Sequence, residues 1–245
     1  MVIKYMQMLE LFRNSKILVV VAHPDDEVLG LGGTMNKLIE DYNCEVHALI
    51  LGEGITSRSD KRVKSEWSDK LKKHRDNIDE AKEHIGYQKV YCHQFPDNRF
   101  DAVDLLDLIK VVEKVKNEFL PDHIFTHHGG DVNIDHQRVF EAVIVSTRPL
   151  KEENNIGIFT FETMSGTEWI ASNNPFKFNP NLFVELEQKN IDSKILAMES
   201  YEFERRSFPH PRSPEALNTR ARMWGVTNGM NFAEAFQIIR LRLKL

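Results

Sequence analysis

The first 147 residues alternate between short apolar runs and longer segments with helical periodicity. In the segment 104–119, for example, apolar residues recur every three or four positions, which is the helical period. Strand and helix signals that alternate in this way favour a mostly parallel sheet with helices on both faces, so we expect an α/β, Rossmann-like fold. Strands are expected at 17–22, 45–51, 89–93 and 122–126, and helices at 32–40, 74–85, 104–119 and 137–147.

The rhythm changes after Pro149. Strands are expected at 156–163 and 183–186, a helix at 188–201, and an ordered loop at 169–181, which is rich in Asn, Pro and aromatic residues. Ser213 followed by Pro214 is typical of a helix start, with Ser as the N-cap. Because no flexible linker or internal repeat interrupts the chain, we predict a single domain, 1–245. Residues 1–150 would form the sheet core and 151–245 a substrate-loop and helical part.

Composition excludes several classes of protein. The chain has 245 residues, 41% hydrophobic residues and a net charge of −5, which suits one domain with a full core. No basic block or basic-aromatic stripe is present, so nucleic acid is not an expected partner. No apolar run is long enough for a transmembrane helix and no signal-peptide pattern stands at the start, so we expect a cytoplasmic protein.

A first polar cluster follows the first predicted strand. Residues 22–27 read Ala-His-Pro-Asp-Asp-Glu, which places His23, Asp25 and Asp26 at the carboxyl end of that strand. Ligands bind at this edge of open α/β sheets, and one imidazole with two carboxylates suits a metal ion that activates water. The alternative is a turn in which Asp25 or Asp26 accepts backbone N–H groups ahead of the next helix.

A second cluster follows the fourth predicted strand. Residues 126–137 read Thr-His-His-Gly-Gly-Asp-Val-Asn-Ile-Asp-His-Gln, and His136 opens a helix. Because both clusters follow parallel strands, the imidazole of His136 is expected to reach a metal held by the first cluster. A histidine that caps the helix is the alternative for His136 alone. The two clusters together favour a metal site.

These residues resemble a known family. The string 22–27, the Gly-Gly-Thr at 32–34 and the Asp135-His136 pair at a helix start are similar to the zinc-dependent N-deacetylases of the PIG-L or LmbE-like family. The resemblance covers essentially the whole chain, and the tail 208–213 resembles a bacterial subgroup. It implies a hydrolase of carbohydrate metabolism that removes an N-acetyl group from an amino sugar or sugar conjugate, with zinc as cofactor.

The resemblance also implies roles for individual residues. His23, Asp26 and His136 would bind one zinc ion per chain, and Asp25 would be the general base. Spacing alone leaves open which of the two aspartates binds the metal. Two imidazoles and one carboxylate leave a place for water, and the same donors also accept iron(II), cobalt or nickel. Asp135 would orient His136 or a neighbouring group, or cap the helix.

One position departs from the family pattern. Members commonly carry a histidine three residues before the last ligand, where it stabilises the tetrahedral intermediate or protonates the leaving amine, but this chain has Asn133 there. Asn133 donates a hydrogen bond but is not an acid. We hypothesise that His210, held between two prolines, supplies the missing imidazole. His127 and His128 are rivals for that role, and His210 as a plain loop residue is the alternative.

Other polar residues follow the second and third strands. Arg58 lies after the second strand and Asp97, Asn98 and Arg99 after the third, and the resemblance implies that such residues hold sugar hydroxyls. Together with Arg212 of the C-terminal loop they are the expected substrate-binding residues, because Arg with Asp also suits a phosphate or hydroxyl clamp. Surface salt bridges or an Asp turn are the alternative.

Three other functions remain open. A dinucleotide-binding oxidoreductase would use the glycines of 30–35, but Met35 stands where its fingerprint needs Gly or Ala. A non-catalytic metal- or sugar-binding protein, or an amidase that acts on a non-sugar acyl amide, would share the same site. The expected partner is therefore a small N-acetylated sugar or sugar conjugate, and the family resemblance is compatible with a homo-oligomer.

Overall fold

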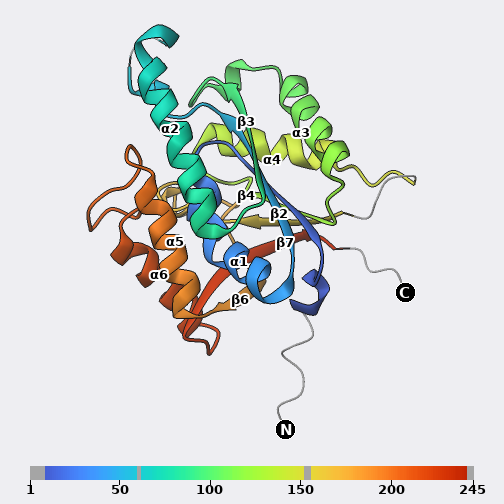
Figure 1. The fold of residues 1–245 in the computed structure, drawn as a ribbon. Helices are drawn as coiled ribbons and strands as arrows, with labels where there is room; N and C mark the ends of the chain where they lie inside the picture. Colours follow the sequence, from blue (N-terminus) through green and yellow to red (C-terminus); the bar gives the residue numbers. More distant parts are fainter. Residues whose placement is uncertain (1–8, 60–61, 152–155, 242–245) are drawn as a thin grey trace.

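The computed structural model describes residues 9–59, 62–151 and 156–241, and its centre is one seven-stranded sheet (Figure 1). The strands run in the order β3-β2-β1-β4-β5-β7-β6. Every neighbouring pair is parallel except the two made by β7, which runs antiparallel to β5 and β6. The mostly parallel sheet confirms the predicted fold class. The strands are β1 Lys16–Val21, β2 Glu45–Gly52, β3 Lys89–Phe95, β4 His123–His127, β5 Gly157–Phe161, β6 Leu182–Leu186 and β7 Phe232–Arg240.

Helices cover both faces of the sheet: α1, α2, α5 and α6 lie on one face and α3 and α4 on the other (Figure 1). Strand β1 packs into both layers, since Ile17, Val19 and Val21 join the first core and Leu18 and Val20 the second. A strand covered on both faces is apolar at every position, which explains the uninterrupted run that the sequence shows. The helices are α1 Asp26–Tyr42, α2 Lys64–Ile85, α3 Leu105–Phe119, α4 Ile134–Ser146, α5 Gln188–Ser200 and α6 Pro214–Val226.

Three helices begin earlier than the sequence pattern predicts. Helix α1 begins at Asp26 rather than near Gly32, α2 at Lys64 rather than His74, and α4 at Ile134 rather than Gln137. The first turns of α2 are mostly exposed, so they lack the apolar stripe by which periodicity detects a helix. Among the residues that the structure describes, no helix is both long and apolar enough to cross a bilayer.

The glycines of α1 serve helix packing. A Cβ on Gly30 would lie 2.1 Å from the ring of Phe161, so only glycine allows this helix to lie so close to β5. Helix α1 is non-helical at Leu31, and the carboxylate of Glu234 accepts the N–H groups of Gly33 and Thr34 at 3.2 and 2.7 Å. Since these glycines lie within the helix and not in the turn before it, the structure excludes the dinucleotide fingerprint.

The order of the strands determines where a site can form. From β1 the chain moves outward through β2 and β3 on one side, and later through β4 and β5 on the other. The crevice at the carboxyl ends of two such central strands is where open α/β sheets bind ligands. The two polar clusters of the sequence follow β1 and β4, so the topology brings them to this crevice.

Candidate active site

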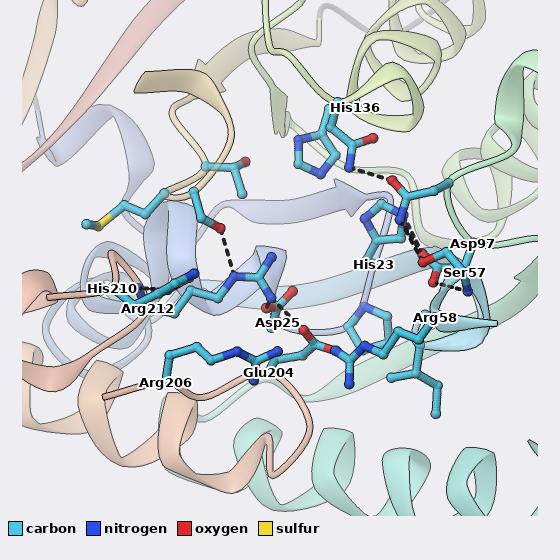
Figure 2. Close-up of a pocket in the computed structure, with 18 of the residues that line it drawn as sticks. His23, Asp25, Ser57, Arg58, Asp97, His136, Glu204, Arg206, His210 and Arg212 are labelled. Atoms are coloured by element: carbon cyan, nitrogen blue, oxygen red, sulfur yellow. Dashed lines mark hydrogen bonds and ion pairs between the residues drawn. The ribbon is translucent and has the colours of Figure 1, made fainter. Parts of the chain in front are cut away.

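A cavity of about 300 Å³ opens at the carboxyl end of the sheet (Figure 2). The segments that follow each of the strands β1 to β5 contribute residues to its wall, and the C-terminal loop closes one side. Among the described residues, seven that are not glycine have a positive φ, and four of these, Asp25, Ile55, Asn98 and Ser165, line this cavity. Unfavourable backbone conformations tend to gather at functional sites. The lining segments are 23–25, 54–58, 97–98, 133–136, 163–169 and 204–212.

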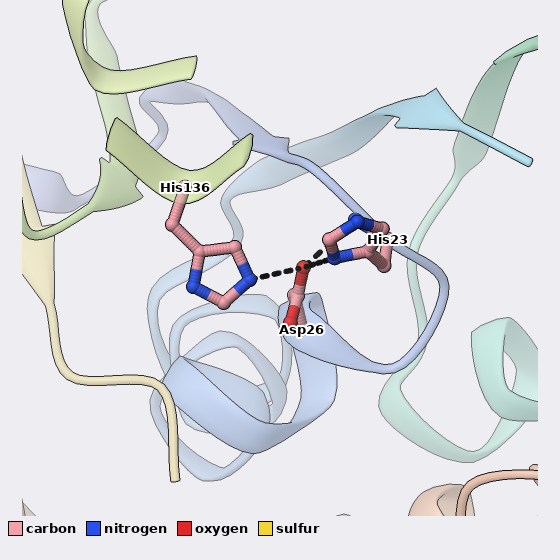
Figure 3. Close-up of side chains that lie close together, drawn as sticks. All are labelled: His23, Asp26 and His136. Atoms are coloured by element: carbon pink, nitrogen blue, oxygen red, sulfur yellow. Dashed lines mark hydrogen bonds and ion pairs between the residues drawn. The ribbon is translucent and has the colours of Figure 1, made fainter. Parts of the chain in front are cut away.

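Three side chains form a candidate metal centre (Figure 3), and two of them, His23 and His136, line the cavity. Asp26 Oδ2 lies 3.4 Å from His23 Nδ1 and 3.4 Å from His136 Nε2, and each pair of donor atoms is within 4.8 Å. Asp26 begins α1 and His136 lies in the first turn of α4. The three residues expected as metal ligands therefore lie together, although two of them are more than 100 positions apart in sequence.

The charged neighbours of these three groups shift their pKa values. Burial alone would lower the pKa of His136, but Asp26 and Asp131 raise it to about 9. Burial would also lower the pKa of His23, yet Asp135 and Asp26 raise it well above its usual value. Conversely, burial would raise the pKa of Asp26, but His136 holds it well below the usual range. A divalent cation would take over the charge that the imidazole protons otherwise supply.

A separate carboxylate holds each candidate histidine ligand. His23 Nε2 is 3.0 Å from Asp135 Oδ2, and Asp135 Oδ1 accepts the N–H of Phe100 at 2.8 Å. His136 Nδ1 is 3.2 Å from Asp131 Oδ2. Asp135 thus contacts His23 and not its sequence neighbour His136. The sequence reasoning gave Asp131 no role, although it stands in the same turn as Asp135, five residues before the histidine that it contacts.

Asp25 is buried beside the metal centre and meets an arginine from the far end of the chain. Its Oδ2 lies 2.9 Å from Arg212 Nη1. Burial raises the pKa of Asp25 well above its usual value, although Arg212 opposes this shift. The backbone of Asp25 has a φ of 109°, and its N–H donates to Glu27 Oε2 at 3.1 Å. Glu27 in turn accepts the hydroxyl of Tyr201 through its other oxygen.

The histidines proposed to replace the family's second histidine lie in different surroundings. His127 is fully buried: its Nε2 accepts the N–H of Ala22, and its Nδ1 is 2.9 Å from Thr163 Oγ1. Burial lowers the pKa of His127 to about 4, so the ring is neutral. His128 Nε2 lies 2.8 Å from the carbonyl oxygen of Phe176. Neither histidine lines the cavity.

His210 and Asn133 do line the cavity. His210 Nδ1 accepts the N–H of Arg212 at 3.1 Å, which leaves Nε2 to carry the proton of the neutral ring. Burial and the charge of Arg212 lower the pKa of His210, so it is a neutral hydrogen-bond donor. Asn133 is the N-cap of α4, since its Oδ1 accepts the N–H of Asp135 at 2.8 Å, and its Nδ2 donates to Asn98 at 3.0 Å.

The expected substrate-binding residues divide into two groups. Arg58, Asp97, Asn98 and Arg212 line the cavity, whereas Arg99 is exposed and does not. Asp97 accepts the backbone N–H of Ser57 at 2.9 Å and lies 3.3 Å from His23 Nε2.

Two further lining residues, Glu204 and Arg206, were missed by the sequence reasoning. Glu204 joins two arginines, at 2.5 Å from Arg58 Nη2 and 2.5 Å from Arg212 Nη1 (Figure 2). The available signal was that both residues lie in the same C-terminal loop as His210 and Arg212.

Comparisons with known proteins identify one relative by sequence and two by fold. An uncharacterised deacetylase of Escherichia coli K12, YaiS, is 25% identical over 200 residues, which are 77% of this chain and 91% of that protein. The fold is shared with N,N'-diacetylchitobiose deacetylase from Pyrococcus horikoshii, with a TM-score of 0.71, 20% identity and coverage of 92% of this chain and 84% of that one. It is also shared with the 4-carboxy-2-hydroxymuconate hydratase GalB from Pseudomonas putida KT2440, with a TM-score of 0.67, 18% identity and coverage of 94% and 98%.

The strongest assignment comes from a family model. The model described as PIG-L, GlcNAc-PI de-N-acetylase, matches residues 18–146, which is more than half of the chain. The match includes both polar clusters, and with them His23, Asp26 and His136. The chain therefore belongs to the PIG-L family.

Proposed function

We propose that this protein is a metal-dependent hydrolase that removes the N-acetyl group of an amino sugar or sugar conjugate. The family match and the deacetylase relatives support an N-deacetylase. The observation that carries the proposal is the convergence of His23, Asp26 and His136 at a cavity that the buried Asp25 also lines. A metal centre with an adjacent base is the arrangement that amide hydrolysis by water requires.

The residues present fit a divalent metal. Within the described ranges, His136 Nε2 is buried without a hydrogen-bond partner, and it lies 3.4 Å from the carboxylate of Asp26. Two imidazoles and one carboxylate are donors that zinc favours in catalytic sites, and the carboxylates of Asp135 and Asp131 fix the two rings. When bound there, the metal supplies Lewis acidity, which polarises a carbonyl and makes water easier to deprotonate.

Side chains of the protein transfer the protons and stabilise the negative charge that develops. Asp25 takes a proton from the attacking water and later returns it to the leaving amine. Burial raises the pKa of Asp25, which makes its carboxylate a stronger base for the proton of the attacking water. Arg212 holds the carboxylate of Asp25 in place. His210, through Nε2–H, and Asn133, through Nδ2–H, donate hydrogen bonds to the oxygen on which negative charge develops.

Two alternative functions use the same site. A non-catalytic metal- or sugar-binding protein would keep the centre without turnover, and an amidase would act on a non-sugar acyl amide. The likeness to a hydratase shows that this fold also supports other chemistry, so fold alone does not decide. The deacetylase is favoured because the family match spans the residues of the centre itself.

The test combines metal analysis with acetate release. We expect the purified protein to hold about one zinc per chain and to release acetate from N-acetylated amino sugars in a metal-dependent way. In Asp25→Asn, acetate release should fall about 100-fold or more while the metal stays bound. Metal without release from any acetylated sugar would indicate a binding protein, and release only from non-sugar acyl amides would indicate the amidase. No bound metal would remove the basis of the proposal.

A further inference from the structure

Three arginines point into the cavity on the side opposite His136. Arg58 comes from the segment after β2, and Arg206 and Arg212 come from the C-terminal loop (Figure 2). The side of the cavity near His23 has different chemistry. Asp97 lies 3.3 Å from His23 Nε2, and with its neighbour Asn98 it offers acceptors and donors that suit hydroxyl groups. The cavity thus has a basic side and a mixed polar side.

The basic side carries more positive than negative charge. Glu204 is shared by Arg58 and Arg212, at 2.5 Å from each, and Arg212 also contacts Asp25. Arg206 is left without a carboxylate: within the described part of the chain its Nη1 donates to the backbone carbonyls of Phe203 and Arg205, both at 2.8 Å, and it forms no ion pair. Three guanidinium groups therefore face two carboxylates.

Glu204 organises this side and does not occupy it. Both of its oxygens already accept from a guanidinium, so its charge is compensated, and it fixes the directions of Arg58 and Arg212. Each guanidinium has five N–H donors, so N–H groups of Arg58 and Arg206 remain for a ligand. A planar fork of donors matches a carboxylate or phosphate group better than it matches a sugar hydroxyl.

We propose, on the basis of the proposed function, that the amino-sugar substrate carries an anionic substituent, a carboxylate or a phosphate, which binds between Arg206 and Arg58. The acetamido group would lie at the metal centre and the anionic group on the basic side of the cavity. Arg206 is then a specificity-determining residue, because it selects charged over neutral acetamido sugars and takes no part in the hydrolysis itself.

The first test compares substrates of the zinc-loaded protein. N-acetylglucosamine is the neutral reference, N-acetylglucosamine 6-phosphate and 1-phosphate carry phosphate, and N-acetylmuramic acid carries a carboxylate. We expect kcat/KM to be at least about tenfold higher for one or more of the charged sugars than for the neutral one. The advantage should shrink as salt is added, because screening weakens the attraction. Which of the charged sugars is preferred separates phosphate from carboxylate.

The second test uses Arg206→Gln with Arg205→Gln as its matched control. Arg205 is the neighbouring exposed arginine, whose Nη1 lies 3.6 Å from Glu199 and which does not line the cavity. In Arg206→Gln, the ratio of kcat/KM for the charged sugar to that for the neutral sugar should fall about tenfold, mainly through KM, and in Arg205→Gln it should not change. An unchanged ratio in Arg206→Gln would overturn the inference.

A binding measurement keeps the inference separate from the deacetylase proposal. Glucosamine 6-phosphate and glucosamine are titrated into wild-type protein and Arg206→Gln. Tighter binding of the phosphate, lost in Arg206→Gln, supports the anionic subsite even if no sugar releases acetate, in which case only the proposed function fails. Turnover of charged and neutral sugars with equal kcat/KM, and equal binding of the two amines, would refute the subsite and leave the deacetylase standing.

Discussion

The guanidinium of Arg212 lies 2.9 Å from the buried carboxylate of Asp25. Asp25 belongs to the segment matched by the family model, and Arg212 lies well beyond that segment, in the C-terminal loop. The proposed base is therefore provided by the part of the chain that matches the family model, but its charge environment is provided by the C-terminal loop. A substitution in that loop can therefore act on the proposed base without removing a candidate metal ligand.

Removal of the Arg212 charge should move the pH dependence of the reaction. Arg212 lowers the pKa of Asp25 against the effect of burial, so in Arg212→Met the pKa rises further. A general base must be deprotonated, and the acid limb of the kcat/KM profile should therefore shift to higher pH. We also expect kcat at the optimum to fall about 10- to 100-fold, because Asp25 loses its orienting contact. The measurement is the pH–rate profile at saturating zinc.

Arg212→Lys serves as the control, because it keeps the charge and loses the planar fork. Its acid limb should stay close to that of the wild type, although kcat should still be reduced. Zinc content should be the same in both variants, since Arg212 does not contact the metal ligands. An acid limb that stays in place in Arg212→Met would show that Arg212 does not act on the base.

Asp131 should be a positioning residue for metal binding. Its carboxylate lies 3.2 Å from His136 Nδ1 and also accepts the hydroxyl of Thr167 at 2.5 Å. In Asp131→Asn, His136 loses the partner that orients it, and zinc affinity should weaken about 10- to 100-fold. Competition with a chelator measures this loss. The exposed Asp192 on α5 provides a control, Asp192→Asn, whose affinity should equal that of the wild type. Equal affinity in Asp131→Asn would contradict the assignment.

The sequence predicts the site best where polar residues directly follow a strand. The apolar runs of β1 and β4 mark their own carboxyl ends, and parallel strands place those ends at one edge, so the meeting of His23 and His136 was predictable. The partners of the two histidines were not. Asp135 and His136 are consecutive in a helix, so their side chains point about 100° apart. Asp135 therefore contacts His23, and the carboxylate that contacts His136 is that of Asp131.

The contribution of the C-terminal loop depends on long-range topology. Strand β7 enters between β5 and β6, antiparallel to both, and no local pattern in the sequence specifies this order. The approach of Glu204 and Arg206 to the cavity follows from that arrangement, so their role could not be deduced from the loop itself. Only the prolines around His210 and Arg212 mark these two residues in the sequence.

Tyr201 should stabilise the backbone of the proposed base. Its hydroxyl donates to the buried carboxylate of Glu27, whose other oxygen holds the N–H of Asp25. Tyr201→Phe keeps the ring and leaves an oxygen of Glu27 without its donor, which should cost about 1–3 kcal/mol in the free energy of unfolding. We also expect kcat to fall while KM for substrate changes little, because Asp25 is less firmly held. Urea unfolding and steady-state kinetics test the two effects, and loss of stability with unchanged kcat would leave Tyr201 a purely structural role.

His74 should make the fold sensitive to mild acid. The ring is buried, and neither nitrogen has a hydrogen-bond partner among the described residues. Burial lowers the pKa of His74 to about 4 from an ordinary 6.5. At a pH between these two pKa values, His74 is protonated in the unfolded chain and neutral in the folded protein. His74 therefore lowers the free energy of unfolding as the pH falls from 6.5 towards 4. His74→Phe cannot bind this proton and keeps an aromatic ring against Tyr201 and Phe203. Between pH 7.5 and pH 4.5, the free energy of unfolding should therefore fall by about 2 kcal/mol less in His74→Phe than in the wild type. Urea unfolding of the metal-free proteins measures this difference without interference from metal release, and curves of stability against pH that run parallel would show that His74 is not the group responsible.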